Sequence, residues 1–200
     1  MALGSFFMTP FALITIRGWL IQDFGADSAG DWESSRKLLE LVTALFTAYF
    51  AMVLLPKLAK ISDTKLLRLE ILNNAVVLMA LSFLALLILF ILRDQAYYVV
   101  FSSDFSFSSD LMGLRAIGEF LRSLIWIFGF ILVVKAKVKL YLLTGFVYML
   151  ALLFTSWFMI GAYGVIGANY AYILSNSLML VVSILIFYYI TSNSYNKPKL

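Results

Sequence analysis

The chain has 200 residues, of which 63% are hydrophobic and only 13% are charged, and its mean hydropathy is +0.97. It contains no cysteine and no histidine, which excludes disulfides, zinc sites and imidazole catalysis, and 15 basic against 11 acidic residues give a net charge of +4. Because soluble domains are about half apolar and a quarter charged, this composition predicts an all-α integral membrane protein.

Six apolar stretches follow one another along the chain, and each is long enough to cross the hydrocarbon core of a bilayer as a helix. They cover residues 3–22, 38–56, 71–92, 111–134, 140–161 and 166–190. We therefore predict a single membrane domain over residues 1–200, built as a bundle of six transmembrane helices.

The segments between these stretches alternate in charge. One set is basic and comprises Lys57, Lys60, Lys65, Arg68, Lys135, Lys137, Lys139, Lys197 and Lys199. The other set is rich in acids and comprises Asp23, Asp27, Asp31, Glu33, Asp94, Asp104 and Asp110, with Arg36, Lys37 and Arg93 as its cations. Since basic loops stay on the cytoplasmic side, both termini are expected in the cytoplasm, which an even number of spans also requires.

Three local signals refine this map. Pro56 is expected to terminate the second helix at the membrane surface, and residues 163–167, with two glycines, predict a tight turn. The loop over residues 101–110 alternates aromatic and polar residues and is expected along the membrane interface.

Charged residues inside the fourth stretch form a pattern. Arg115, Glu119 and Arg122 are spaced i, i+4 and i+7, which places them on one helix face. An ionisable residue near the bilayer centre costs about 2.5–3.5 kcal/mol and usually faces the bundle interior or a wet cavity. Two interpretations fit: an anion-binding wall in a central cavity, or a structural pair near a helix end whose arginines snorkel to the interface.

Two further charges lie at the ends of the first two stretches. Arg17 follows Pro10, which frees a backbone carbonyl and bends a membrane helix, so Arg17 either faces a cavity or snorkels outward. Glu40 follows Arg36 by one helical turn, which favours a structural pair. Glu119 is the better candidate for a proton-coupling carboxylate, with Glu40 second, whereas Asn169 and Asn176 predict hydrogen bonds between helices.

Several short motifs along the chain, taken in order, resemble those of a known protein family. Along the first two stretches they are Pro10 with Arg17, Gly30-Asp31-Trp32, Glu40 at an acidic position and Leu54-Leu55-Pro56; further on they are Gly118-Glu119-Phe120-Leu121-Arg122, Phe128-Gly129-Phe130, Lys135-Ala136-Lys137 and Gly164-Val165-Ile166-Gly167-Ala168 with Tyr172. In this order they resemble the Wzx-type lipid-linked oligosaccharide flippases of the multidrug/oligosaccharidyl-lipid/polysaccharide superfamily, in particular the enterobacterial-common-antigen branch.

The resemblance covers essentially the whole chain but only the C-terminal half of a family member. It implies one six-helix lobe of a MATE-like fold, a lobe that partners a separately encoded or missing N-terminal lobe in the bacterial inner membrane. It also implies translocation of an undecaprenyl-diphosphate-linked glycan for O-antigen and related surface polysaccharides, driven by an ion gradient. Arg17, Arg115, Arg122 and Glu119 would then contact the substrate or line its cavity, and no metal, cofactor or nucleic acid is expected.

Other functions remain open. A MATE-type drug or ion antiporter would require an anionic cavity, which the basic balance disfavours. A membrane-embedded glycan enzyme would require a histidine or clustered outer carboxylates, neither of which the sequence offers, so no enzymatic activity is expected. An inactive fragment or an assembly subunit of a split transporter is the remaining alternative.

Overall fold

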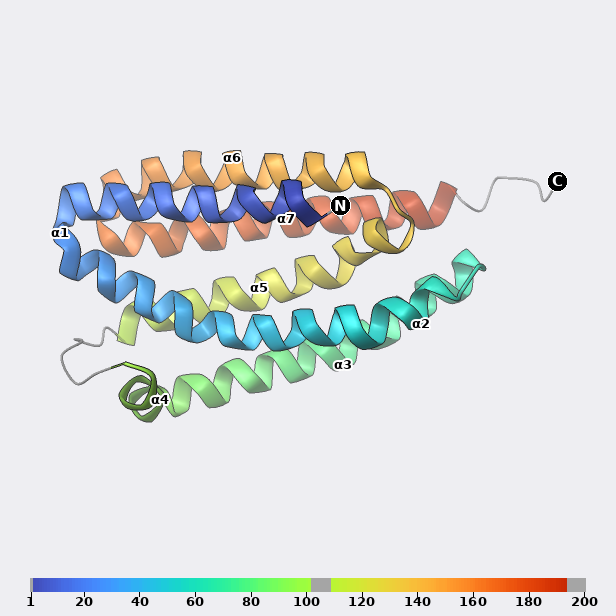
Figure 1. Ribbon diagram of the computed structural model, residues 1–200, viewed down its shortest axis with the longest axis horizontal. Coiled ribbons are helices and arrows are strands. Elements are labelled where there is room, and N and C mark those ends of the chain that lie inside the picture. Colours follow the sequence, from blue (N-terminus) through green and yellow to red (C-terminus); the bar gives the residue numbers. More distant parts are fainter. Residues whose placement is uncertain (1, 102–108, 194–200) are drawn as a thin grey trace.

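The computed structural model describes residues 2–101 and 109–193, and every regular element in these ranges is a helix (Figure 1). The elements are α1 Ala2–Tyr49, a π-helical turn Phe50–Leu54, α2 Leu55–Ala59, α3 Thr64–Ile91, α4 Arg93–Val100, α5 Ser109–Val134, α6 Val138–Tyr163 and α7 Val165–Asn193. Large apolar side chains such as Phe154 and Met52 are more than 70% exposed at the protein surface. The prediction of an all-α membrane bundle is confirmed.

The first two predicted spans both fall in α1, which is interrupted at Gly25 (φ 87°, ψ 167°). Together with the turn that follows, the helical segment Phe7–Ala59 has 53 residues. A straight helix of that length would measure about 80 Å at 1.5 Å per residue, against a hydrocarbon core of about 30 Å. The segment fits because α1 turns back on itself, and its two halves run in opposite directions (Figure 1). The break with non-helical dihedral angles lies at Gly25, whereas the helix continues through Pro10.

The prediction that Pro56 ends the second helix is wrong. The chain widens into the π-helical turn Phe50–Leu54 just before Pro56 and then continues as α2 to Ala59. Proline lacks an N–H and its ring collides with the carbonyl four residues earlier. A π-helical turn ahead of it changes the local hydrogen-bond register, so Pro56 can stand in the first turn of α2.

The basic segments gather at one end of the bundle. Figure 1 places the connection from α2 to α3, the turn from α5 to α6 and the end of α7 together, opposite the Gly25 bend and α4. The predicted tight turn after α6 is confirmed, and it turns at Gly164 with a φ of 67°. Most of the loop 101–110, and the tail lysines Lys197 and Lys199, lie outside the described residues.

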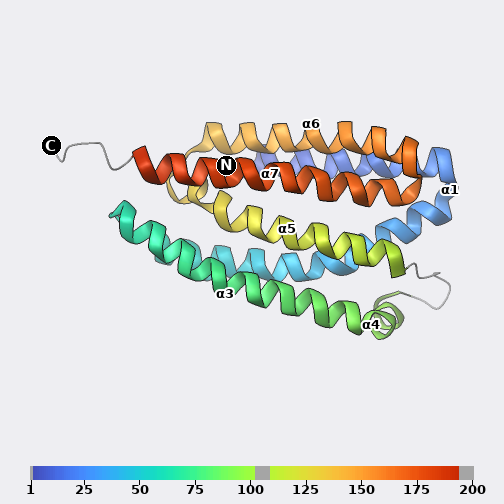
Figure 2. The same cartoon turned by 180° about the vertical axis from the view of Figure 1, so that it is seen from behind.

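The helices form two groups that face each other (Figures 1 and 2). The first half of α1 packs on α6 and α7 through a buried cluster that includes Ile16, Leu20, Leu152 and Ala168. The second half of α1, with α2, α3 and α5, forms the other group, and near the basic end its core also takes in Phe187 of α7. The candidate site lies between the two groups.

Candidate functional site

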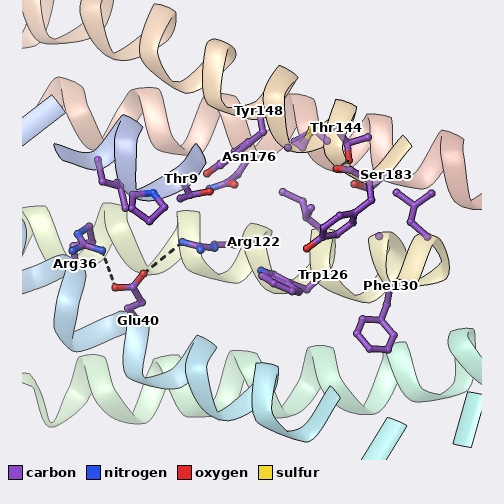
Figure 3. Close-up of a pocket in the computed structure, with 18 of the residues that line it drawn as sticks. Thr9, Arg36, Glu40, Arg122, Trp126, Phe130, Thr144, Tyr148, Asn176 and Ser183 are labelled. Atoms are coloured by element: carbon purple, nitrogen blue, oxygen red, sulfur yellow. Dashed lines mark hydrogen bonds and ion pairs between the residues drawn. The ribbon is translucent and has the colours of Figure 1, made fainter. Parts of the chain in front are cut away.

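A cavity of about 720 Å³ lies between the two helix groups. Its wall is made by both halves of α1 and by α5, α6 and α7. Figure 3 shows charged side chains at one end, around Arg36, Glu40 and Arg122, and uncharged ones along the rest, from Trp126 to Phe130 and Ser183. The cavity is therefore polarised along its length.

The charged end holds four cations against two carboxylates. The lining residues are Arg17, Arg36, Lys37 and Arg122, with Glu33 and Glu40. Their formal sum is 4 − 2, a net charge of +2. Such an excess of positive charge along one cavity wall makes an anion a favourable occupant.

The two carboxylates are held by arginines. Arg36 donates from Nε to Glu33 Oε2 at 3.0 Å and from Nη1 to Glu40 Oε2 at 2.7 Å. Arg122 Nη1 lies 3.9 Å from Glu40 Oε1, so Glu40 stands between two guanidinium groups (Figure 3). The predicted pair of Arg36 and Glu40 is confirmed. Arg17 and Lys37 form no ion pair with any described residue, so the excess charge resides on them.

Behind this wall lies a second, fully buried charge cluster. Arg115 and Glu119 form an ion pair with Nη2 3.1 Å from Oε1, and both side chains are 0% exposed. Thr43 and Tyr172 each donate a hydroxyl hydrogen bond to the carboxylate of Glu119 at 2.8 Å. The guanidinium of Arg115 lies 3.5 Å from the centre of the Tyr172 ring, an additional cation–π contact.

The buried cluster also reaches the cavity. Arg122 Nη1 donates to the Tyr172 hydroxyl at 3.2 Å, and that hydroxyl donates onward to Glu119. One tyrosine thus links the buried pair to a cavity arginine. Because the Tyr172 hydroxyl contacts both Glu119 and Arg122, we interpret Glu119 as a structural anchor that orients Arg122.

The structure divides the residues that sequence patterns singled out. Arg17, Arg122 and Glu40 line the cavity, whereas Arg115 and Glu119 are enclosed and do not. The expectation that all three arginines line one cavity is therefore wrong, because the Tyr172 ring of α7 covers Arg115. Of the two carboxylates predicted for ion coupling, Glu40 is the one at the cavity.

Sequence reasoning missed three contributors. Arg36, Lys37 and Glu33 were assigned to an outer loop or to structural pairing, yet all three line the cavity. They lie in the second half of α1, which turns back beside Arg17. Their helical spacing of i, i+3 and i+4 was the available signal.

Uncharged polar groups occupy the rest of the wall. Tyr148 and Thr144 from α6, and Asn176 and Ser183 from α7, line the cavity opposite Trp126 of α5. Asn176 also donates to the Gly118 carbonyl at 3.3 Å, and Asn169 donates to the Leu111 carbonyl at 2.9 Å. The predicted hydrogen bonds between helices are confirmed for both asparagines. No cluster of metal-ligating side chains occurs among the described residues.

Comparison with known proteins adds a relationship in sequence. The chain is 27% identical over 173 residues to proteins named lipid III flippase from Escherichia coli K12 and from Shigella flexneri. No family model and no solved structure matches the chain. The aligned region covers 86% of this chain and 41% of each relative, so the chain spans less than half of their length. Within those limits, the multi-pass bundle is similar in sequence to a lipid-linked flippase.

Proposed function

We propose that this chain is one lobe of a flippase that moves an undecaprenyl-diphosphate-linked oligosaccharide across the bacterial inner membrane. The observation that carries the proposal is the cavity with a net charge of +2 at one end and an uncharged wall beyond it. The sequence similarity to lipid III flippases supports the same substrate class.

The charge distribution matches the chemistry of this substrate. A lipid diphosphate is anionic, and carrying it through hydrocarbon without counter-charge is strongly unfavourable. Arg17 and Lys37, which form no ion pair with a described residue, would neutralise it, and Arg122 would add a guanidinium able to contact two phosphate oxygens. A drug antiporter for cations would favour the opposite sign of charge.

The orientation in the membrane and a second lobe belong to the same proposal. The gathering of basic segments at one end supports cytoplasmic termini (Figure 1). The coverage of 41% of each relative supports a missing or separately encoded N-terminal lobe that closes the cavity from the other side. Co-purification of this chain from its own cells with a second multi-pass protein is the expected result.

Binding of the substrate class tests the proposal directly. The chain is reconstituted into phosphatidylcholine nanodiscs and titrated with undecaprenyl diphosphate. The double variant Arg17→Ala and Arg122→Ala is expected to weaken binding at least tenfold, since a charge-assisted hydrogen bond contributes about 1.5–3 kcal/mol. Arg68→Ala is the matched control, because Arg68 lies on α3 over the Tyr188 ring, away from the cavity.

The same substitutions made in the chromosomal copy test transport. Glycan export at the cell surface is expected to fall at normal protein level in the double variant and to stay unchanged in the control. Full export together with undiminished lipid binding in the double variant would refute the proposed function.

A further inference from the structure

Two polar atoms of the cavity wall, across from Arg122, have no hydrogen-bond partner among the described residues. They are the hydroxyl of Tyr148 and the side-chain oxygen Oδ1 of Asn176, and both atoms are buried. Leaving a buried polar atom unpaired costs about 1–3 kcal/mol. An arrangement that keeps two of them in one cavity therefore points to a ligand.

Their chemical types are complementary. The Asn176 amide is fixed because Nδ2 donates to the Gly118 carbonyl, which leaves Oδ1 as an acceptor. Tyr148 offers a hydroxyl that can donate or accept. Asn176 is 0% exposed, so the group is held by packing and its orientation is set before any ligand arrives. Neither group is charged at neutral pH, and an uncharged ligand with hydroxyl or amide groups would satisfy both.

The opposite wall supplies an aromatic face. Trp126 lies on α5 four residues after Arg122, one helical turn and about 6 Å along the axis. Figure 3 places Arg122 and Trp126 along one wall, with Tyr148 and Asn176 across from them. Gly129, which also lines the cavity, leaves space beside Trp126, since a Cβ there would meet no atom within 4 Å.

We infer that Trp126, Tyr148 and Asn176 form a subsite for a neutral sugar, next to the cationic end of the cavity. The inference rests on the proposed function and specifies it: the first sugar of the glycan is bonded directly to the phosphate, so its site has to adjoin the phosphate site. The negative face of the indole attracts the weakly positive C–H face of a pyranose. Tyr148 and Asn176 then bind sugar hydroxyl or acetamido groups on the other side.

The competing occupant of this wall is the isoprenoid tail of the lipid. The two occupants are separated by comparing two probes in nanodiscs: undecaprenyl diphosphate, and the same lipid carrying one N-acetylhexosamine on its diphosphate. Tyr148→Phe is the principal variant because it removes one unpaired oxygen and keeps the ring. Tyr163→Phe, on the same helix but exposed and outside the cavity, is its matched control.

Tyr148→Phe is expected to weaken binding of the glycosylated lipid about five- to tenfold, the effect of one net hydrogen bond. Tyr148→Phe should change binding of the bare lipid less than twofold. Tyr163→Phe should change binding of either probe less than twofold. Gly129→Leu, whose Cβ would meet no atom within 4 Å and whose side chain would occupy space beside Trp126, should likewise weaken binding of the glycosylated probe and spare that of the bare one.

Equal weakening of both probes by Gly129→Leu would assign the wall to the tail and overturn the inference. Unchanged binding of the glycosylated probe by Tyr148→Phe would overturn it as well. The proposed function fails separately, when binding of the bare lipid is insensitive to the double variant Arg17→Ala and Arg122→Ala.

Discussion

The Tyr172 hydroxyl donates a 2.8 Å hydrogen bond to the carboxylate of Glu119, a residue that sequence patterns had assigned to the cavity. The same hydroxyl accepts a hydrogen bond from Arg122, so a residue of α7 connects the buried charge of α5 to the cavity wall. The position of the cavity arginine thus depends on a tyrosine outside its own helix.

Removing only that hydroxyl tests the connection. Tyr172→Phe keeps the ring over Arg115 but leaves one acceptor and one donor without their partner. We expect a loss of about 1–3 kcal/mol in the free energy of unfolding, measured as a lower unfolding temperature in detergent micelles. Tyr170→Phe, on the same helix but partly exposed, should change it little; an equal loss there would show that the hydroxyl network has no special role.

The buried ion pair predicts a non-additive response. Glu119→Gln leaves the guanidinium of Arg115 buried without a counter-charge, and breaking such a pair costs about 3–5 kcal/mol. The double variant Arg115→Met with Glu119→Gln removes both charges, so it should be more stable than Glu119→Gln alone. Equilibrium unfolding of all four members of the cycle measures this, and simple additivity of the two single effects would contradict the pairing.

Close packing of α5 on α7 makes Gly118 sensitive to size. A Cβ at this position would lie 2.3 Å from Cδ1 of the Tyr172 ring. Gly118→Ala is therefore expected to destabilise the bundle by about 1–3 kcal/mol, as overpacked cores do. At Gly161 of α6 a Cβ meets nothing within 4 Å, so Gly161→Ala is the control, with no loss expected in the same thermal assay.

The bend in α1 depends on the backbone freedom of one glycine. Gly25 has φ 87° and ψ 167°, a region that is essentially restricted to glycine and costs other residues about 1–3 kcal/mol. Gly25→Ala should lower the unfolding temperature, whereas Gly18→Ala, in the straight first half of α1 with open space around it, should not. If both variants unfold at the wild-type temperature, the bend does not require glycine.

Substitution of Glu40 tests whether added positive charge strengthens lipid binding. Its carboxylate lies between Arg36 and Arg122 at the charged end of the cavity. Glu40→Gln raises the net charge of the lining residues from +2 to +3, so undecaprenyl diphosphate should bind several-fold more tightly, with a steeper dependence on salt. Weaker binding would indicate that Glu40 holds the arginines in place rather than opposing the phosphate.

The sequence by itself determined which segments are helical, but not where every helix ends. Hydropathy is a property of local composition, and the six apolar ranges are almost entirely helical in the structure, although the first two share α1 and the range 38–56 runs from α1 through the π-helical turn Phe50–Leu54 into α2. The spacing of Arg36 and Glu40 was enough to pair them, because neighbours on one helix need no other element. The loop expected after residue 22 was wrong, since α1 resumes directly after Gly25 and buries Trp32 and Arg36 in the bundle.

Only the tertiary structure decided which charges meet the cavity. Arg115 and Arg122 share one face of α5, yet the ring of Tyr172 covers the first and leaves the second at the wall. Lys37 and Arg17 line the same cavity because α1 folds back at Gly25, a change of direction made by a single backbone conformation. Contacts between helices depend on how each helix is rotated and shifted against its neighbours, and a pattern along one helix does not show which of its residues a side chain of another helix will cover.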